Sequence, residues 1–190
     1  MENRDMMNGR NYDYNRKIKI LFDSNGDTRT ADHLSSYEEI KAATESHQKD
    51  VSNIMNFISD AICSAGVWHD FTKTYRLQQF YKEFTEYKQS GKDFTKSDWY
   101  QMHIRAERHH LNNNCPEDVD LIDVIEMIAD CVAAGLARSG YVRPVEIPED
   151  VLKKAVTNTA KMIESQCEVV REAPEYKQVR NNRHLPFEPF

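Results

Sequence analysis

An adjacent histidine and aspartate, His69 and Asp70, lie in the stretch GVWHDFTKT, where an apolar helical pattern ends. An imidazole and a carboxylate side by side can be two ligands of one divalent ion, because both side chains offer lone pairs that suit metals of intermediate hardness. A His-Asp pair is also common by chance. The pair therefore gains meaning only from further ligands that the fold brings near it.

The first candidate partner is His47, which interrupts the apolar stripe of the helix before the pair. Ser36 and Glu39 form a capping-box pattern, and apolar residues then recur at steps of three and four as far as Gly66. This pattern predicts a helix over 36–65. A histidine on an apolar face can be a hydrogen-bonded core residue or a metal ligand, and both interpretations stay open for His47.

A second group of candidates lies in the stretch DWYQMHIRAERHH, which predicts a helix over about 97–111. In such a helix His103, Glu107 and His110 share one face, whereas His109 points about 100° away. Burying this helix would therefore also bury some of its histidines. Glu107 could orient a ligand histidine through its second ring nitrogen. The alternative is that this face of the helix is simply exposed to solvent.

A carboxylate at the margin of another apolar helix completes the candidate ligands. The segment 119–138 has apolar residues at helical spacing and ends before Gly140. Asp130 lies in its IEMIADCVAAG stretch. A carboxylate there is costly to bury unless it is paired or bound to a metal.

Basic residues close to these candidates could hold the oxygens of an anionic substrate. Lys73 follows the His-Asp pair by one helical turn and is the strongest candidate, with an exposed lysine as the equally weighted alternative. Arg76, Arg105 and Arg108 come next.

The order of these residues resembles the HD superfamily of metal-dependent phosphohydrolases, in which a histidine, a His-Asp pair and a distant aspartate bind a divalent metal. The resemblance covers about 36–140, and HDFTK, DWYQMHIRAERHH and IEMIAD are similar to an uncharacterised bacterial and phage branch with HDxSK or TK and a downstream double histidine. It implies an all-α, HD-domain-like bundle of about five to six helices with a short extended N-terminal segment.

The resemblance also implies a set of metal ligands: His47, His69, Asp70 and Asp130. Extra histidines hold a second metal in some members of the superfamily, with the aspartate of the pair as a bridge, and His103, His109 and His110 resemble them. Here these histidines crowd into one helix, which leaves open whether one ion or two is bound. Of the three, His103 and His110 have the better geometry to coordinate one ion jointly, whereas His109 could lie behind the ligands or contact a phosphate. Imidazoles and carboxylates together suit manganese, iron, cobalt, nickel or zinc.

The implied function is hydrolysis of a phosphoester in a nucleotide or another small phosphorylated molecule. A bound ion would lower the pKa of a coordinated water, and Asp70, Lys73 and Glu107 would be the catalytic side chains. Two alternatives stay open, a di-iron oxygenase on the same fold and a non-catalytic nucleotide-binding module. The resemblance is also compatible with a homodimer.

The composition sets limits on the class of protein. The chain has 190 residues, of which 39% are hydrophobic and 29% charged, which favours one soluble, mainly helical domain. Its net charge of -6 argues against nucleic acid as a partner. The four cysteines are scattered without a CxxC pair, so neither a disulfide framework nor a thiolate zinc site is expected. No transmembrane run or signal sequence is recognisable, and we expect a cytoplasmic protein without membrane contact.

Four segments are expected along the chain: a polar arm over 1–35, an HD-like metal-binding core over 36–140, a C-terminal helix within 141–175 that packs on the core, and an extended tail over 176–190. In the arm, RKIKILFD could be a strand or an extended segment, and a turn follows at Asn25-Gly26. Further helices are predicted over about 75–89 and 149–171. The last helix and tail could close the site or contact a second copy of the chain.

Overall fold

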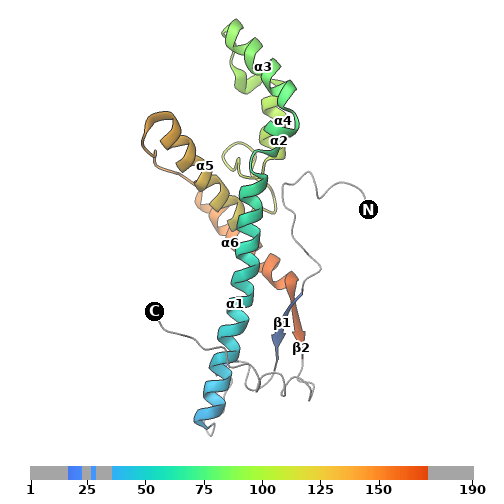
Figure 1. Cartoon of the computed structure of the whole chain (residues 1–190), viewed down its shortest axis with the longest axis vertical. Helices are drawn as coiled ribbons and strands as arrows, with labels where there is room; N and C mark the ends of the chain where they lie inside the picture. Colours follow the sequence, from blue (N-terminus) through green and yellow to red (C-terminus); the bar gives the residue numbers. More distant parts are fainter. Residues whose placement is uncertain (1–16, 23–26, 29–35, 171–190) are drawn as a thin grey trace, which may run out of the picture. The chain divides into compact units, whose positions relative to one another are not determined.

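The computed structural model describes residues 17–22, 27–28 and 36–170. The elements are, in order, β1 (Ile18–Leu21), α1 (Tyr37–Trp68), α2 (Phe71–Tyr75), α3 (Leu77–Ser90), the 3-10 turn η3 (Phe94–Lys96), α4 (Asp98–Ala106), α5 (Leu121–Ser139), α6 (Glu149–Gln166) and β2 (Cys167–Val170) (Figure 1). Helices dominate, which confirms the predicted all-α class. None of the helices in these residues combines the length and the apolar character that a membrane crossing needs. The predicted turn at Asn25-Gly26 and the predicted tail lie outside the described residues.

Residue contacts divide the chain into two compact units. Among the described residues, the larger unit comprises 57–164, and the smaller one combines 17–22, 27–28, 36–56 and 165–170. All the residues singled out for chemistry belong to the larger unit, with the exception of His47. The architecture of the larger unit therefore positions the candidate site.

Two clusters of buried apolar side chains hold the larger unit together. One joins α5 and α6 to the segment between α4 and α5 and consists of Leu111, Val119, Val124, Met127, Val151 and Ala155. The other joins the last part of α1 to the start of α5 through Ala61, Ala65 and Ile122, with Met162 of α6 packed against it. Burial of this apolar surface is the main source of stability. It sets α5 against the end of α1, which is where the His-Asp pair follows.

The boundaries of α5 agree closely with the prediction. Asp120 is the N-cap and accepts hydrogen bonds from the N–H groups of Ile122 and Asp123, and the Asp123 carboxylate accepts one from the Asp120 N–H, which completes a capping box. At the other end Gly140 has a φ of 74°, a left-handed conformation that glycine adopts without strain. Short-range signals of this kind act within a few residues, so the sequence alone locates them.

The end of α1 differs from the prediction. The helix continues through Gly66 to Trp68, and the chain leaves the helical direction at Asp70, whose φ of 56° is left-handed. Asp and Asn tolerate this conformation better than other side chains that have a Cβ. The predicted apolar stripe is also only partly buried, since Ile40 and Val51 are 38% and 44% exposed.

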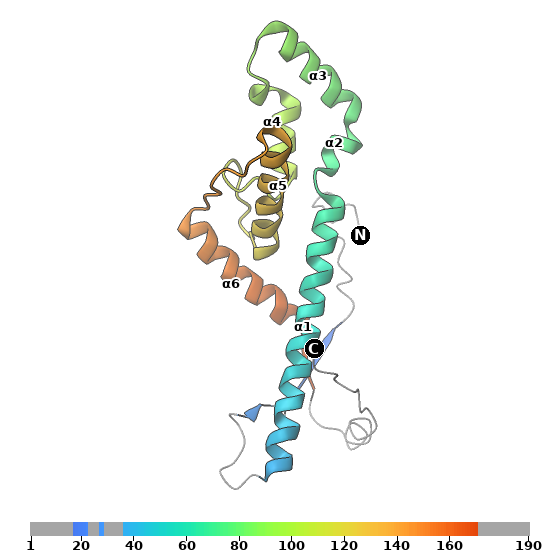
Figure 2. The ribbon, with the colours of Figure 1, turned by 60° about the vertical axis from the view of Figure 1, so that its left-hand side comes forward.

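The helices after the His-Asp pair differ in part from the prediction. The expected helix over 75–89 corresponds to α3, and a short helix that was not predicted, α2, precedes it and ends at Arg76, whose backbone (φ -117°, ψ 35°) is not helical. The chain then turns back through η3 into α4, as Figure 2 shows. Ser97 caps α4 as expected, but this helix ends at Ala106 instead of near 111 because Glu107 is extended (φ -92°, ψ 117°).

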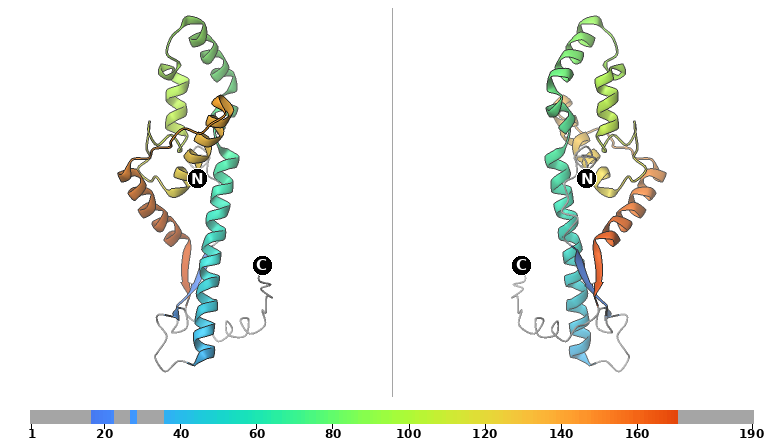
Figure 3. Two further views of the ribbon diagram at one scale, coloured as in Figure 1. Left: turned by 90° about the vertical axis from the view of Figure 1, so that its left-hand side faces the viewer. Right: turned by 90° about the vertical axis from the view of Figure 1, so that its right-hand side faces the viewer.

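The smaller unit contains a two-stranded parallel sheet, in which Ile18 of β1 lies opposite Cys167 of β2 (Figure 3). This pairing confirms the strand alternative for the N-terminal arm. It also corrects the predicted helix over 149–171, because α6 ends at Gln166 and the next residues, CEVV, form β2. Two consecutive valines favour an extended backbone over a helical one.

Candidate metal centre

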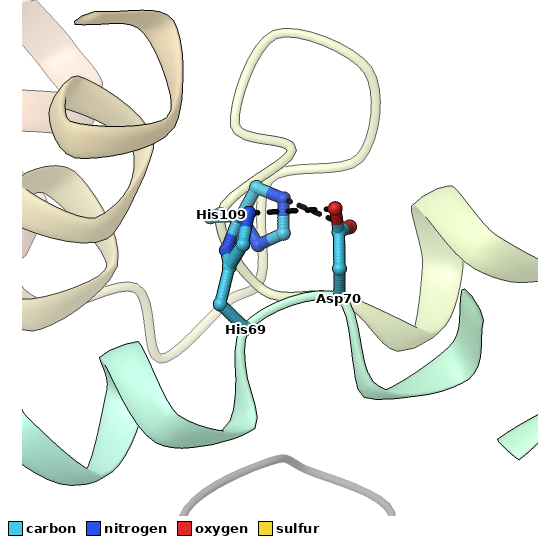
Figure 4. Close-up of side chains that lie close together, drawn as sticks. All are labelled: His69, Asp70 and His109. Atoms are coloured by element: carbon cyan, nitrogen blue, oxygen red, sulfur yellow. Dashed lines mark ion pairs between the residues drawn. The ribbon is translucent and has the colours of Figure 1, made fainter. Parts of the chain in front are cut away.

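Histidines and one aspartate from three places in the larger unit converge on one point. His69 and Asp70 come from the turn between α1 and α2, His103 from α4, and His109 and His110 from the turn that follows α4. Two groups have ligand atoms within 4.8 Å of one another, namely His69, Asp70 and His109, and Asp70, His103 and His110. Asp70 belongs to both groups. In Figure 4 the rings of His69 and His109 lie beside each other and face the Asp70 carboxylate.

In the first group, each histidine directs one nitrogen towards Asp70 and the other towards Glu126. The distances to Asp70 are 3.4 Å from His69 Nε2 to Oδ2 and 3.8 Å from His109 Nε2 to Oδ1. Glu126 Oε1 lies 3.0 Å from His69 Nδ1, as a hydrogen bond, and 2.9 Å from His109 Nδ1, without hydrogen-bond alignment. Glu126 therefore holds both rings from behind.

Glu126 was not among the residues predicted from the sequence. It precedes Asp130 by one helical turn on α5, so the two carboxylates share a face. This i, i+4 spacing was the signal from which Glu126 could have been predicted. A histidine that binds a metal ion through one ring nitrogen is usually oriented by a carboxylate at its other ring nitrogen.

In the second group, a chain of hydrogen bonds sets the orientation of His103. The Thr72 hydroxyl lies 2.5 Å from Glu107 Oε1, to which it donates, and 2.7 Å from His103 Nδ1. Because the hydroxyl proton points to the carboxylate, the Thr72 oxygen accepts a hydrogen bond from Nδ1–H of His103. The Nε2 lone pair of His103 is thereby directed at Asp70 Oδ1, 3.4 Å away, and at His110 Nε2, 2.9 Å away.

Replacing Thr72 with valine should destabilise the protein by about 2 kcal/mol, because the buried Glu107 carboxylate loses a donor and His103 Nδ1 loses its acceptor. Valine keeps the shape of threonine, so no cavity is created. Urea unfolding of the metal-free protein measures the change. Thr74→Val, at an exposed position of α2, is the control and should unfold at the wild-type midpoint. Equal midpoints for both variants would contradict the orienting role of Thr72.

Some atoms at the centre of the cluster are buried without a partner. Asp70 Oδ1 and His109 Nε2 have no hydrogen-bond partner among the residues that the structure describes, and His109 Nδ1 has only the unaligned contact with Glu126. Buried polar atoms are normally paired, so such a concentration indicates a missing ligand. Ligand atoms about 2.1 Å from one ion are about 3.0 Å apart at right angles and about 4.2 Å apart when opposite. The separations of 2.9 to 3.8 Å fall in this range, and the cluster could hold a metal ion.

The protonation states of the histidines differ between the groups. Burial lowers the pKa of His103 to about 3 and that of His110 to about 4, so both rings are neutral, as metal binding requires. Burial opposes the charge of Glu126, but the contacts with His109 and His69 outweigh it and hold the pKa of Glu126 at about 2. The hydrogen bond between His69 and Glu126 raises the pKa of His69, so a proton and a metal ion compete for the Nε2 atom of His69.

Lys73, expected to contact a phosphate, pairs with the Asp70 carboxylate. Burial alone would raise the pKa of Asp70, but the hydrogen bond and the charge of Lys73 lower it. Asp70 is therefore ionised, and its negative charge is available to a cation.

Asp130 lies at the edge of the first group. Its Oδ1 is 3.6 Å from His69 Nε2, and its side chain is 37% exposed. Of the four ligands that the resemblance implied, the structure thus brings three together, His69, Asp70 and Asp130.

His47 is not among the residues that the structure brings together. It belongs to the smaller unit, where its Nδ1 lies 3.4 Å from the Asp27 carboxylate and its side chain is 51% exposed. Neither group of converging ligand atoms found among the described residues contains His47.

His109 lies in the cluster, contrary to the prediction from helical spacing. We expected it to point away from His103 and His110, but α4 ends at Ala106, so helical spacing does not apply to the residues beyond. His109 is 2% exposed and faces Asp70. His103 and His110 meet as expected, although through a turn and not along one helix face.

The predicted substrate-binding arginines have different environments. Arg108 donates from Nε and Nη2 to the buried Asp123 carboxylate, both at 2.9 Å, and from Nη1 to Asp118 at 2.9 Å. This arrangement ties the turn after α4 to the start of α5, and the substrate contact of Arg108 stays a prediction. Arg76 and Arg105 are exposed.

Comparison with known proteins gives one match. A family model with the description "Family of unknown function (DUF5662)" matches residues 36–179. No curated protein and no solved structure matches the chain. The matched region contains every residue of both ligand groups.

Proposed function

The chain belongs to the DUF5662 family, whose function is unknown, and we propose that it is a metal-dependent phosphohydrolase acting on a small phosphorylated molecule such as a nucleotide. The observation that carries the proposal is the shared carboxylate. Asp70 belongs to both ligand groups, and in each group it faces a different pair of histidines. Two ions held close together are a common device for hydrolysing phosphoesters. The resemblance to the HD superfamily supports the same reaction.

The charges of the cluster also support this proposal. Four carboxylates, those of Asp70, Glu107, Glu126 and Asp130, lie around the histidines, and Lys73 is the cation paired among them. With neutral histidines, such a cluster repels a phosphate group. Two divalent ions would reverse the sign of the charge. Phosphate binding and metal binding are therefore coupled.

The side chains divide the work between them. His69 and His109 are held by Glu126, and His103 is held by Thr72, so their Nε2 atoms present lone pairs to a common centre. A divalent ion would lower the pKa of a coordinated water and withdraw electrons from the phosphoryl group. If Asp70 held a cation, the Lys73 ammonium group, which now pairs with Asp70, could instead hold a phosphate oxygen.

The direct test is phosphate release by the purified full chain. After removal of bound metal, the protein is loaded with manganese, iron, cobalt, nickel or zinc and supplied with nucleotides and simple phosphate esters. We expect release of inorganic phosphate with at least one metal, and none after chelation. A His69→Gln variant, in which an uncharged amide replaces the imidazole, should be inactive. A protein that binds none of these metals would contradict the proposal.

An oxygenase is the second candidate, favoured by the number of histidines around a single carboxylate. Such a nitrogen-rich set also suits iron. The oxygenase would contain two irons and consume dioxygen without releasing phosphate. Binding of nucleotides without turnover would instead favour the non-catalytic module.

A further inference from the structure

An apolar hollow of about 300 Å³ opens beside the ligand groups, between the last part of α1 and α5. Its walls include Ile62 and Ala65 from α1 and Ile125 and Ala129 from α5. All of these residues belong to the larger unit. The volume is that of a small-molecule site.

The hollow is continuous with the candidate metal centre at one end. His69, Glu126 and Asp130 line it, and His69 of the first ligand group lies 3.0 Å from Glu126 and 3.6 Å from Asp130. A molecule whose phosphate lies at the ligand groups could therefore extend its remaining part between α1 and α5.

The lining discriminates between kinds of substrate. Apart from these three polar side chains, the lining residues are isoleucines, alanines and one glycine, with no lysine or arginine among them. Sugar hydroxyls and the polar edges of a base would lose their hydrogen bonds to water on such walls, which costs free energy. Additional phosphate groups would meet the carboxylates of Glu126 and Asp130 without a compensating cation.

We propose that this hollow binds the apolar organic group of the substrate, which is then a phosphate monoester of an aliphatic or aromatic alcohol. The inference rests on the proposed phosphohydrolase function and narrows its substrate class. Binding transfers the apolar group from water to apolar walls, so affinity rises with the apolar area of the group.

The test uses phosphonates, whose carbon-phosphorus bond is not hydrolysed, so that binding is measured apart from turnover. Calorimetry on the manganese-loaded full chain compares methylphosphonate, phenylphosphonate and adenosine 5′-monophosphate. We expect phenylphosphonate to bind at least about tenfold more tightly than methylphosphonate. It should also bind more tightly than the nucleotide.

Two variants locate the effect. Ala129→Leu fills the hollow and should remove the preference for phenylphosphonate while leaving methylphosphonate binding unchanged. Ala137→Leu makes the same change at an exposed position of α5 outside the hollow and should keep the preference.

The outcomes separate this inference from the proposed function. Equal affinities of the two phosphonates, absent binding of both, or tighter binding of the nucleotide would overturn the inference. The proposed phosphohydrolase function would still be supported if phosphate were released from other esters. An unchanged preference in Ala129→Leu would also overturn the inference. If phenylphosphonate is preferred and the preference depends on Ala129, but no ester is hydrolysed, the apolar binding site stands and the proposed hydrolase function is refuted.

Discussion

In the proposed two-ion phosphohydrolase, replacement of Asp70 with asparagine should remove both metal ions and lower phosphate release by at least about a thousandfold, a loss of about 4 kcal/mol of transition-state stabilisation. The reason is that one carboxylate serves both ligand groups, with Oδ2 3.4 Å from His69 and Oδ1 3.4 Å from His103. An uncharged amide keeps the size of the side chain but is a weaker ligand for a divalent ion. Two ions are therefore lost through one substitution.

Asparagine is the right substitution for a reason of backbone conformation. Asp70 has a φ of 56°, which asparagine tolerates and alanine does not, so Asp70→Ala would add strain to the loss of the ligand. The metal content of the purified variant, measured by mass spectrometry, gives the stoichiometry. Asp60→Asn, an exposed position of α1, is the matched control and should bind metal as the wild type does. If Asp70→Asn kept two ions and full activity, the shared-carboxylate site would be refuted.

Replacement of Glu126 with glutamine should weaken binding of one metal ion by about 10- to 100-fold. Oε1 of Glu126 lies within 3.0 Å of the Nδ1 atoms of both His69 and His109. Glutamine lacks the negative charge that strengthens these contacts, and its amide can present N–H groups where the rings need an acceptor. Both rings then lose the orientation that directs Nε2 to Asp70.

The second ligand group gives this experiment an internal reference. His103 is oriented by Thr72 and not by Glu126, so the ion at His103 and His110 should keep most of its affinity. Competition of the protein with a metal-binding dye resolves the two affinities. Glu146→Gln, at an exposed position, should leave both unchanged. A uniform loss at both ions would show that the groups are not separately oriented, and no loss would refute the role of Glu126.

Local signals in the sequence account for several parts of the site. The capping residues of α5 and the glycine at its end determine where Asp130 lies, and Ser97 determines where α4 begins. The adjacency of His69 and Asp70 required no folding to recognise. These features were predictable because caps, turns and helical periodicity act over a few residues.

Contacts between distant segments account for the rest. Glu107 leaves the helical conformation while its carboxylate binds the backbone N–H and the hydroxyl of Thr72, 35 residues away, and this ends α4 early. The resulting turn brings His109 to Asp70, contrary to the prediction from helical spacing. The pairing of β1 with β2 likewise shortens α6.

The sequence by itself thus determined the helical class, the adjacent His-Asp pair and the lysine beside it, because each depends on neighbouring residues. Only the tertiary structure decided which histidines meet at Asp70. It brought His109 to Asp70 and placed Glu126 beside the rings of His69 and His109, because meeting at one point depends on contacts between remote segments.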